Sequence, residues 1–206
     1  MINTFNRFTL LTCFIAPLSL AQSQEIASDT PVQPFTSTYS VIHKSDPVGT
    51  ATRQLKKLAD GTFEYSYHNH IEWLIFSDDR RETSILKVDN NKVTPLSYQY
   101  NRSGTGRDKF YHWTYDHTAS TAKNIKDERT INVDFTNGLQ DKLSYHLQNR
   151  INLINAYKAH TANEAAKLDK QTTFTYPVIS TSGSIKDYVY QYDGEEEIIL
   201  PYGLVK

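Results

Sequence analysis

The stretch "TFEYSYHNHIEWLIF" at residues 62–76 decides the fold class, because apolar and polar side chains alternate along it. One face of this run carries Phe63, Tyr65, Tyr67, Ile71 and Trp73, and the polar residues between them fall on the other face. Successive side chains of a strand point to opposite faces, so this alternation predicts a half-buried β-strand. The dipeptide Asp60-Gly61 directly before it predicts a tight turn from a preceding strand.

Runs of the same kind lie on both sides of this stretch. They occupy residues 35–43, 48–59, 81–89, 92–102, 109–116, 120–127 and 130–135, and then 173–180, 185–193 and 195–200. Most are joined by short polar turns, such as Asn90-Asn91 and the glycine-containing segment 103–108. About ten strands joined in this way predict an antiparallel meander rather than βαβ units. The chain has no internal repeat, and residues 35–206 are expected to form a single β-rich domain.

The segment "FTNGLQDKLSYHLQNRINLINAY" at residues 135–157 departs from this pattern. Its apolar residues recur at helical spacing, which predicts one long amphipathic α-helix. These residues are Leu139, Leu143, Leu147, Ile151 and Ile154. Asn137 is expected to cap the helix, with Asp141 near the positive end of the helix dipole. Together the patterns predict a mainly β (α+β) fold, a curved antiparallel sheet or half-barrel with the helix packed on its concave face.

Residues 1–21 predict export from the cytoplasm. Arg7 precedes the apolar run "FTLLTCFIAPLSLA", and Ser19 and Ala21 match the small residues that a signal peptidase reads. We therefore expect a signal peptide cleaved after Ala21, and a periplasmic or secreted mature protein with no transmembrane segment. Lipidation of Cys13 is a weaker alternative, because no small residue precedes this cysteine. Residues 22–34 are polar with two prolines, which predicts a flexible leader.

Composition limits the chemistry of the mature chain. Cys13 is the only cysteine, so we expect no disulfide, no thiol nucleophile and no thiolate metal site. The chain has 22 basic and 23 acidic residues, and without Arg7 the net charge is about −2, which gives no reason to expect nucleic acid as a partner. The segment "SGTGRD" leads into a strand rather than a helix, and no Gly-x-Ser-x-Gly motif is present. We therefore expect no cofactor and no catalytic residues.

The order of these elements resembles a family of exported bacterial proteins catalogued as domain of unknown function 3108. The segments that carry the resemblance are "FTSTYSVIHKSDPVGTATRQL", "NNKVTPLSYQYNRSGTGRDKFYHWTYD", "GLQDKLSYHLQNR" and "YDGEEEIILPYG". The resemblance implies an envelope domain similar in outline to the open half-barrels of lipoprotein carriers, which hold acyl chains between sheet and helix. Members of the family continue beyond the Pro-x-Gly turn. This sequence stops at "LPYGLVK", so we expect either truncation at the C-terminus or an unusual pairing of the last segment.

Tyrosine recurs with period two in several predicted strands, for example at 65 and 67 and at 98 and 100. A tyrosine ring is apolar but its hydroxyl needs a partner, so these faces suit either a half-wet groove or cross-strand aromatic packing. The helix likewise either completes the core or covers an apolar cavity. If it covers a cavity, the residues expected to line it are Tyr65, Tyr67, Trp73, Tyr98, Tyr100, Trp113, Leu143, Leu147 and Ile151.

Two polar clusters have weaker functional interpretations. His68 and His70 share one face of a strand and could begin a zinc site, for which His112 or His117 would supply a further ligand. Alternation places the pair opposite Tyr65 and Tyr67, on the solvent face, so we expect no metal. The segment "SDDRRE" at residues 77–82 is interpreted as a charged turn.

The sequence therefore predicts a non-catalytic binding or carrier protein of the cell envelope, whose ligand is hydrophobic or amphipathic, such as a lipid. The alternative is an assembly or interaction module in which an exposed sheet edge pairs with another envelope protein. A third and less favoured interpretation is a protein that binds or acts on glycans, with aromatic side chains stacked on sugar rings.

Overall fold

The computed structural model describes residues 32–163, 167–200 and 203–205, so the predicted signal peptide and most of the predicted leader lie outside the described residues. The fold is mainly β, as predicted. One antiparallel sheet contains eight strands in chain order. They are β1 (Phe35–His43), β2 (Asp46–Lys57), β3 (Phe63–Trp73), β4 (Phe76–Asp89), β5 (Lys92–Gly104), β6 (Lys109–Asp116), β7 (Thr121–Asn124) and β8 (Thr130–Asn132).

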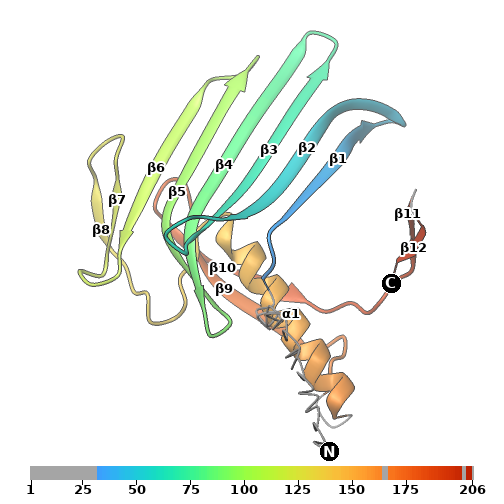
Figure 1. The fold of residues 1–206 in the computed structure, drawn as a ribbon. Coiled ribbons are helices and arrows are strands. Elements are labelled where there is room, and N and C mark those ends of the chain that lie inside the picture. Colours follow the sequence, from blue (N-terminus) through green and yellow to red (C-terminus); the bar gives the residue numbers. More distant parts are fainter. Residues whose placement is uncertain (1–31, 164–166, 201–202, 206) are drawn as a thin grey trace, which may run out of the picture.

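The sheet is a continuous meander with two separate edges, as Figure 1 shows. In the described part of the chain β1 pairs only with β2, and β8 pairs only with β7, so the sheet is not closed into a barrel. The long strands β3, β4 and β5 form its middle. No helix in the described ranges combines the length and the apolarity needed to cross a bilayer.

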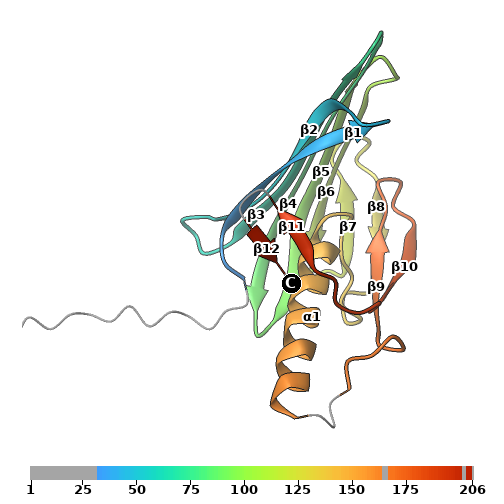
Figure 2. The ribbon, with the colours of Figure 1, turned by 90° about the vertical axis from the view of Figure 1, so that its right-hand side faces the viewer.

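The remaining elements follow the sheet in sequence. They are α1 (Ser144–Ala162), the hairpin β9 (Thr173–Ile179) and β10 (Ile185–Gln191), and the short hairpin β11 (Ile198–Leu200) and β12 (Gly203–Val205). Figures 1 and 2 show that the first half of α1 lies against one end of the sheet, whereas its second half runs past that end.

The stretch at residues 62–76 is not one strand, because a two-residue turn at Leu74-Ile75 interrupts it. Trp73 and Phe76 face each other across this turn, and residues 77–82 lie within β4. The prediction of a charged turn at 77–82 was therefore wrong. Turns are recognised in a sequence by dipeptides such as Asn-Gly or Asp-Gly, and Leu-Ile is not one of them. The sequence pattern therefore could not predict this hairpin turn.

The helix begins at Ser144, later than the apolar spacing predicted. Gln140 instead continues the extended chain beside β9, where its amide nitrogen donates to the Pro177 carbonyl and its carbonyl accepts from the Ile179 amide. Leu139 and Leu143 are buried but precede the helix. Asn137 is not the cap. The Asp141 carboxylate accepts hydrogen bonds from the backbone amides of Leu143 at 2.8 Å and Ser144 at 2.7 Å, and so satisfies the helix start.

The main core lies between the sheet and the first half of α1. Its most buried members include Leu55, Leu86, Trp113, Leu147 and Ile151, each at most 2% exposed. Val32, at the end of the predicted leader, also packs into this cluster. The Gln148 side chain fixes α1 to the sheet, because its Oε1 accepts from the Val93 amide at 2.6 Å and its Nε2 donates to the Asn91 carbonyl at 2.9 Å.

Candidate functional site

The nine residues predicted to line a cavity fall into three groups. Six belong to the main core and are at most 3% exposed: Tyr65, Tyr98, Trp113, Leu143, Leu147 and Ile151. Tyr67 and Tyr100 are partly buried and pack against that cluster. Trp73 lies apart from the others, at the β3–β4 turn, and is 42% exposed.

The buried six contact protein rather than an open pocket. A water-accessible cavity beside them would expose their side chains, yet Trp113 and Ile151 are 0% exposed. The two polar side-chain atoms of Trp113 and Tyr98 have protein partners: Trp113 Nε1 donates to the Thr181 carbonyl at 3.0 Å, and the Tyr98 hydroxyl donates to Glu82 Oε2 at 2.5 Å. The first half of α1 therefore completes a packed core.

A cavity of about 720 Å³ lies against the second half of α1. The helix contributes Leu153, Ile154, Tyr157 and Lys158, and the segment between β10 and β11 contributes Tyr192, Gly194, Glu195 and Glu196. We call this cavity the α1 groove. Its volume lies within the range of about 300–1,000 Å³ that is typical of small-molecule sites.

The α1 groove continues the same helix face that forms the core. Residues 147, 151, 154 and 158 are three or four positions apart, so they project along one line of an α-helix. Leu147 and Ile151 meet the sheet, whereas Ile154 and Lys158 lie beyond it and line the groove. Tyr157 flanks this line and is 46% exposed. The apolar stripe thus passes from a closed core into an open groove.

The charged side chains of the α1 groove lie among its apolar ones. Lys158 comes from the helix, and Glu195 and Glu196 come from the opposite wall. The tyrosines at 157 and 192 add an apolar ring and a hydroxyl each. An apolar wall with a few polar groups of both signs suits a molecule that has an apolar body and a polar end.

The sequence pattern pointed to part of this groove. Ile154 was the last member of the predicted apolar stripe, and Tyr192 ends the alternating tyrosines of the 188–192 segment. Leu153 and Tyr157 were missed, although they are spaced by one helical turn and could have been paired on that basis. Gly194, Glu195 and Glu196 approach the helix only through the path of the chain after β10, which no local pattern encodes.

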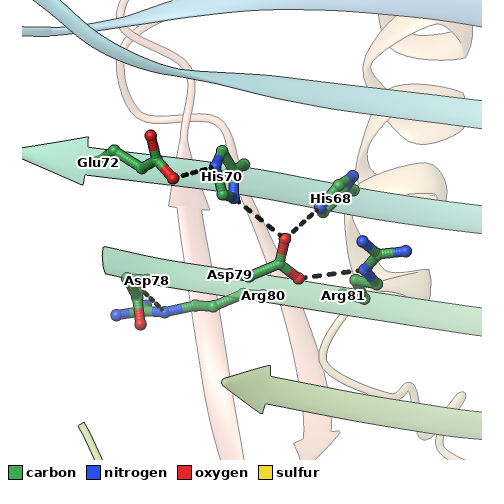
Figure 3. A network of polar contacts seen from close by, with 7 residues as sticks. All are labelled: His68, His70, Glu72, Asp78, Asp79, Arg80 and Arg81. Atoms are coloured by element: carbon green, nitrogen blue, oxygen red, sulfur yellow. Dashed lines mark hydrogen bonds and ion pairs between the residues drawn. The ribbon is translucent and has the colours of Figure 1, made fainter. Parts of the chain in front are cut away.

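His68 and His70 lie on the outer face of the sheet, as predicted, and bind a carboxylate of the neighbouring strand (Figure 3). Asp79 Oδ2 is 2.9 Å from His68 Nε2 and 3.3 Å from His70 Nδ1, and Asp79 Oδ1 accepts from Arg81 Nε at 3.1 Å. Hydrogen bonds from His68 and Arg81 lower the pKa of Asp79 to about 2. This carboxylate therefore stays ionised and holds the cluster together as a surface network.

The described residues contain no group of three or more histidine, cysteine, aspartate or glutamate side chains arranged to hold a metal ion. His112 lies on β6, three strands from β3, which is about 14 Å at the usual strand spacing. His117 Nε2 is 2.7 Å from the Pro95 carbonyl, and its ring packs on Phe135. Neither histidine lies beside the His68–His70 pair.

Asp141 is a buried carboxyl group that the pattern did not single out for burial. Its Oδ2 accepts the Ser84 hydroxyl at 2.6 Å, and its Oδ1 accepts the two backbone amides at the start of α1. Asp141 is 0% exposed, and burial raises the pKa of its carboxyl to about 6 against the opposing effect of these hydrogen bonds. The group joins β4 to the helix start and does not face the α1 groove.

Comparisons with known proteins give no further guide to the site. No family model, no curated protein and no solved structure matches this chain.

Proposed function

We propose that the protein is a non-catalytic binding or carrier protein of the cell envelope, which holds a hydrophobic or amphipathic ligand such as a lipid in the α1 groove. The observation that carries the proposal is the groove of about 720 Å³ on the exposed half of the amphipathic helix. Leu147 and Ile151, which were predicted to line a cavity, are packed in the core on the same stripe of α1. The ligand site that we propose therefore lies at the C-terminal half of α1.

The proposal also includes the half-barrel shape of the sheet and the envelope location that the sequence predicted. We infer a half-barrel outline in which the sheet curves around the first half of α1, as the resemblance to domain of unknown function 3108 implies. Export by the predicted signal peptide would place the protein in the periplasm or outside the cell. An aqueous envelope compartment is where an apolar ligand needs a protein to shield it from water.

A fluorescent fatty acid tests the proposal directly. We expect saturable binding, and we expect Ile154→Asp to weaken it at least about tenfold, because an ionised carboxylate in an apolar wall opposes an acyl chain. Ile185→Asp is the matched control, since Ile185 lies on β10 outside the groove and is 45% exposed. Circular dichroism of all three proteins would show that the fold is kept. Equal affinity of the two variants, or no saturable binding by the parent, would overturn the proposal.

The alternative of an interaction module has one supporting observation. β1 is nine residues long and forms an edge of the sheet, and its outer backbone groups can pair with a strand of another protein. Such pairing would slow hydrogen exchange of the β1 amides in the presence of envelope extract. Exchange that the extract leaves unchanged would argue against it.

A further inference from the structure

The turn between β3 and β4 exposes four large apolar side chains in a row, which we call the apolar tip. Trp73, Leu74, Ile75 and Phe76 are 42%, 84%, 83% and 54% exposed. Figure 1 shows this turn at the end of the sheet farthest from α1. Single exposed apolar residues are ordinary on a protein surface, but four contiguous ones on a protruding turn mark an interaction site.

The backbone of the turn does not require apolar residues. Leu74 has a φ of 55°, a left-handed conformation that asparagine and glycine adopt far more readily than leucine. The other two-residue turns with positive φ in the same sheet carry polar residues, Lys44-Ser45 and Asn90-Asn91. Leu74 thus holds an unfavourable conformation while its side chain packs on little of its own chain. Such a residue points to a role in binding.

The polarity of the hairpin changes in steps away from the turn. Leu74 and Ile75 are outermost, and the rings of Trp73 and Phe76 stack behind them with centroids 6.4 Å apart. The charged residues 78–81 follow along β4. A bilayer has the same order in depth, since aliphatic side chains favour the acyl region, aromatic rings the headgroup level and charges the water.

The charge around the apolar tip is balanced. The turns at this end of the sheet, together with the strand ends beside them, carry three basic and three acidic residues, namely Lys44, Arg107 and Lys109 against Asp46, Glu72 and Asp108. Balanced charge provides no electrostatic pull towards anionic lipid, so apolar insertion must supply the binding. A zwitterionic phospholipid surface fits both observations.

A second copy of the chain fits the apolar tip less well. Four side chains of about 150–250 Å² each, exposed to the fractions above, offer on the order of 500 Å². A stable protein–protein interface needs about 800 Å² of total surface from each partner, so a dimer would also have to bury charged residues beside the tip, such as those at 78–81. We therefore propose that the apolar tip inserts into the interfacial region of a phospholipid bilayer and docks the protein on it. This inference does not depend on the α1 groove.

The two tryptophans make the test specific to the tip. Trp73 is exposed and Trp113 is fully buried, and the chain has no other tryptophan. Phosphatidylcholine vesicles with a nitroxide on the acyl chain should quench the fluorescence of Trp73 and leave that of Trp113 unchanged, so Trp73→Phe should remove the quenched component. The double variant Leu74→Asn with Ile75→Asn places asparagine at the positive φ of Leu74, which asparagine adopts readily, so it should fold. It should partition onto vesicles at least about tenfold less than the parent.

The matched control is Ile185→Asn with Val189→Asn, which removes two exposed apolar side chains from β10 instead. We expect this control to bind vesicles like the parent. Absence of quenching in the parent, or equal loss of binding in both double variants, would overturn the proposal. A parent dimer in sedimentation without vesicles, dispersed by the tip variant, would also overturn it and identify a second copy as the occupant.

Discussion

The buried carboxyl group of Asp141 makes a pH-dependent contribution to stability whose sign the structure fixes. Its pKa is raised by burial from 3.8 to about 6 in the folded protein. The folded state therefore binds more protons than the unfolded state between these two values. The stabilising contribution is fully present below pH 4 and is lost as the pH rises through 6. At pH 7 the ionised group costs on the order of 3 kcal/mol relative to its protonated form.

Asp141→Asn removes the charge and can keep all three contacts. The amide oxygen can accept from the backbone amides of Leu143 and Ser144, and the amide nitrogen can donate to the Ser84 hydroxyl after that hydroxyl reorients. We therefore expect the variant to gain stability over the parent as the pH rises from 4 to 7. The gain should reach about 3 kcal/mol if the isosteric contacts are fully kept.

The assay is urea unfolding of both proteins at several pH values between 4 and 7, followed by tryptophan fluorescence, in which the buried Trp113 becomes exposed on unfolding. The difference in free energy of unfolding between variant and parent isolates Asp141, because every other titrating group occurs in both proteins. A difference that stays constant over this range, or that shifts in favour of the parent as the pH rises, would refute the reasoning. Asp141→Ala serves as a contrast. It leaves the two helix-start amides without this acceptor and should lose about 1–2 kcal/mol even where the parent is protonated.

Burial lowers the pKa of His146 to about 4. The stability that its neutral form contributes to the fold is therefore present above pH 6.5 and is lost as the pH falls towards 4. The urea midpoint of His146→Gln should depend less on pH than that of the parent. Ile151→Ala should cost about 2–5 kcal/mol in urea unfolding, whereas Ile154→Ala in the α1 groove should cost about 1 kcal/mol or less. Leu74→Asn with Ile75→Asn should keep the stability of the parent or raise it by up to about 1 kcal/mol, measured by thermal unfolding, because the positive φ at position 74 suits asparagine. The same double variant should bind the fluorescent fatty acid like the parent, since the apolar tip and the α1 groove lie at opposite ends of the molecule (Figure 1).

The sheet was predictable from the sequence because each strand encodes its own buried face. Tyr65 and Tyr67 point to the side of α1, and His68 and His70 point to solvent, as their alternation indicated. The contact between β4 and the start of α1 was not predictable. It depends on Ser84 and Asp141, which are 57 positions apart in the chain, and an aspartate between the apolar positions of an amphipathic segment gives no sign that it will be buried.

The β3–β4 hairpin shows why a boundary can fail when the strands themselves are right. Strand patterns are recognised by apolar alternation and turns by polar or glycine residues, so an apolar turn is assigned to a strand. Here the apolar run extends through Trp73 to Phe76, so the pattern places the turn in the charged residues after it, which in fact belong to β4. The rule that turns carry polar or glycine residues failed at Leu74-Ile75, where two apolar side chains are exposed although the fold does not require them. Such exceptions are expected at functional sites.

The apolar stripe of α1 contributes both to the packed core and to the α1 groove. Its periodicity predicts an apolar stripe but cannot say how much of that stripe the sheet will cover. That depends on where the strands end relative to α1. Leu147 and Ile151 lie within the sheet's reach and form core, while Ile154 and Tyr157 lie beyond it and form the α1 groove. A packed core and a ligand site are thus successive segments of one stripe, and substitutions at 151 and 154 separate stability from binding.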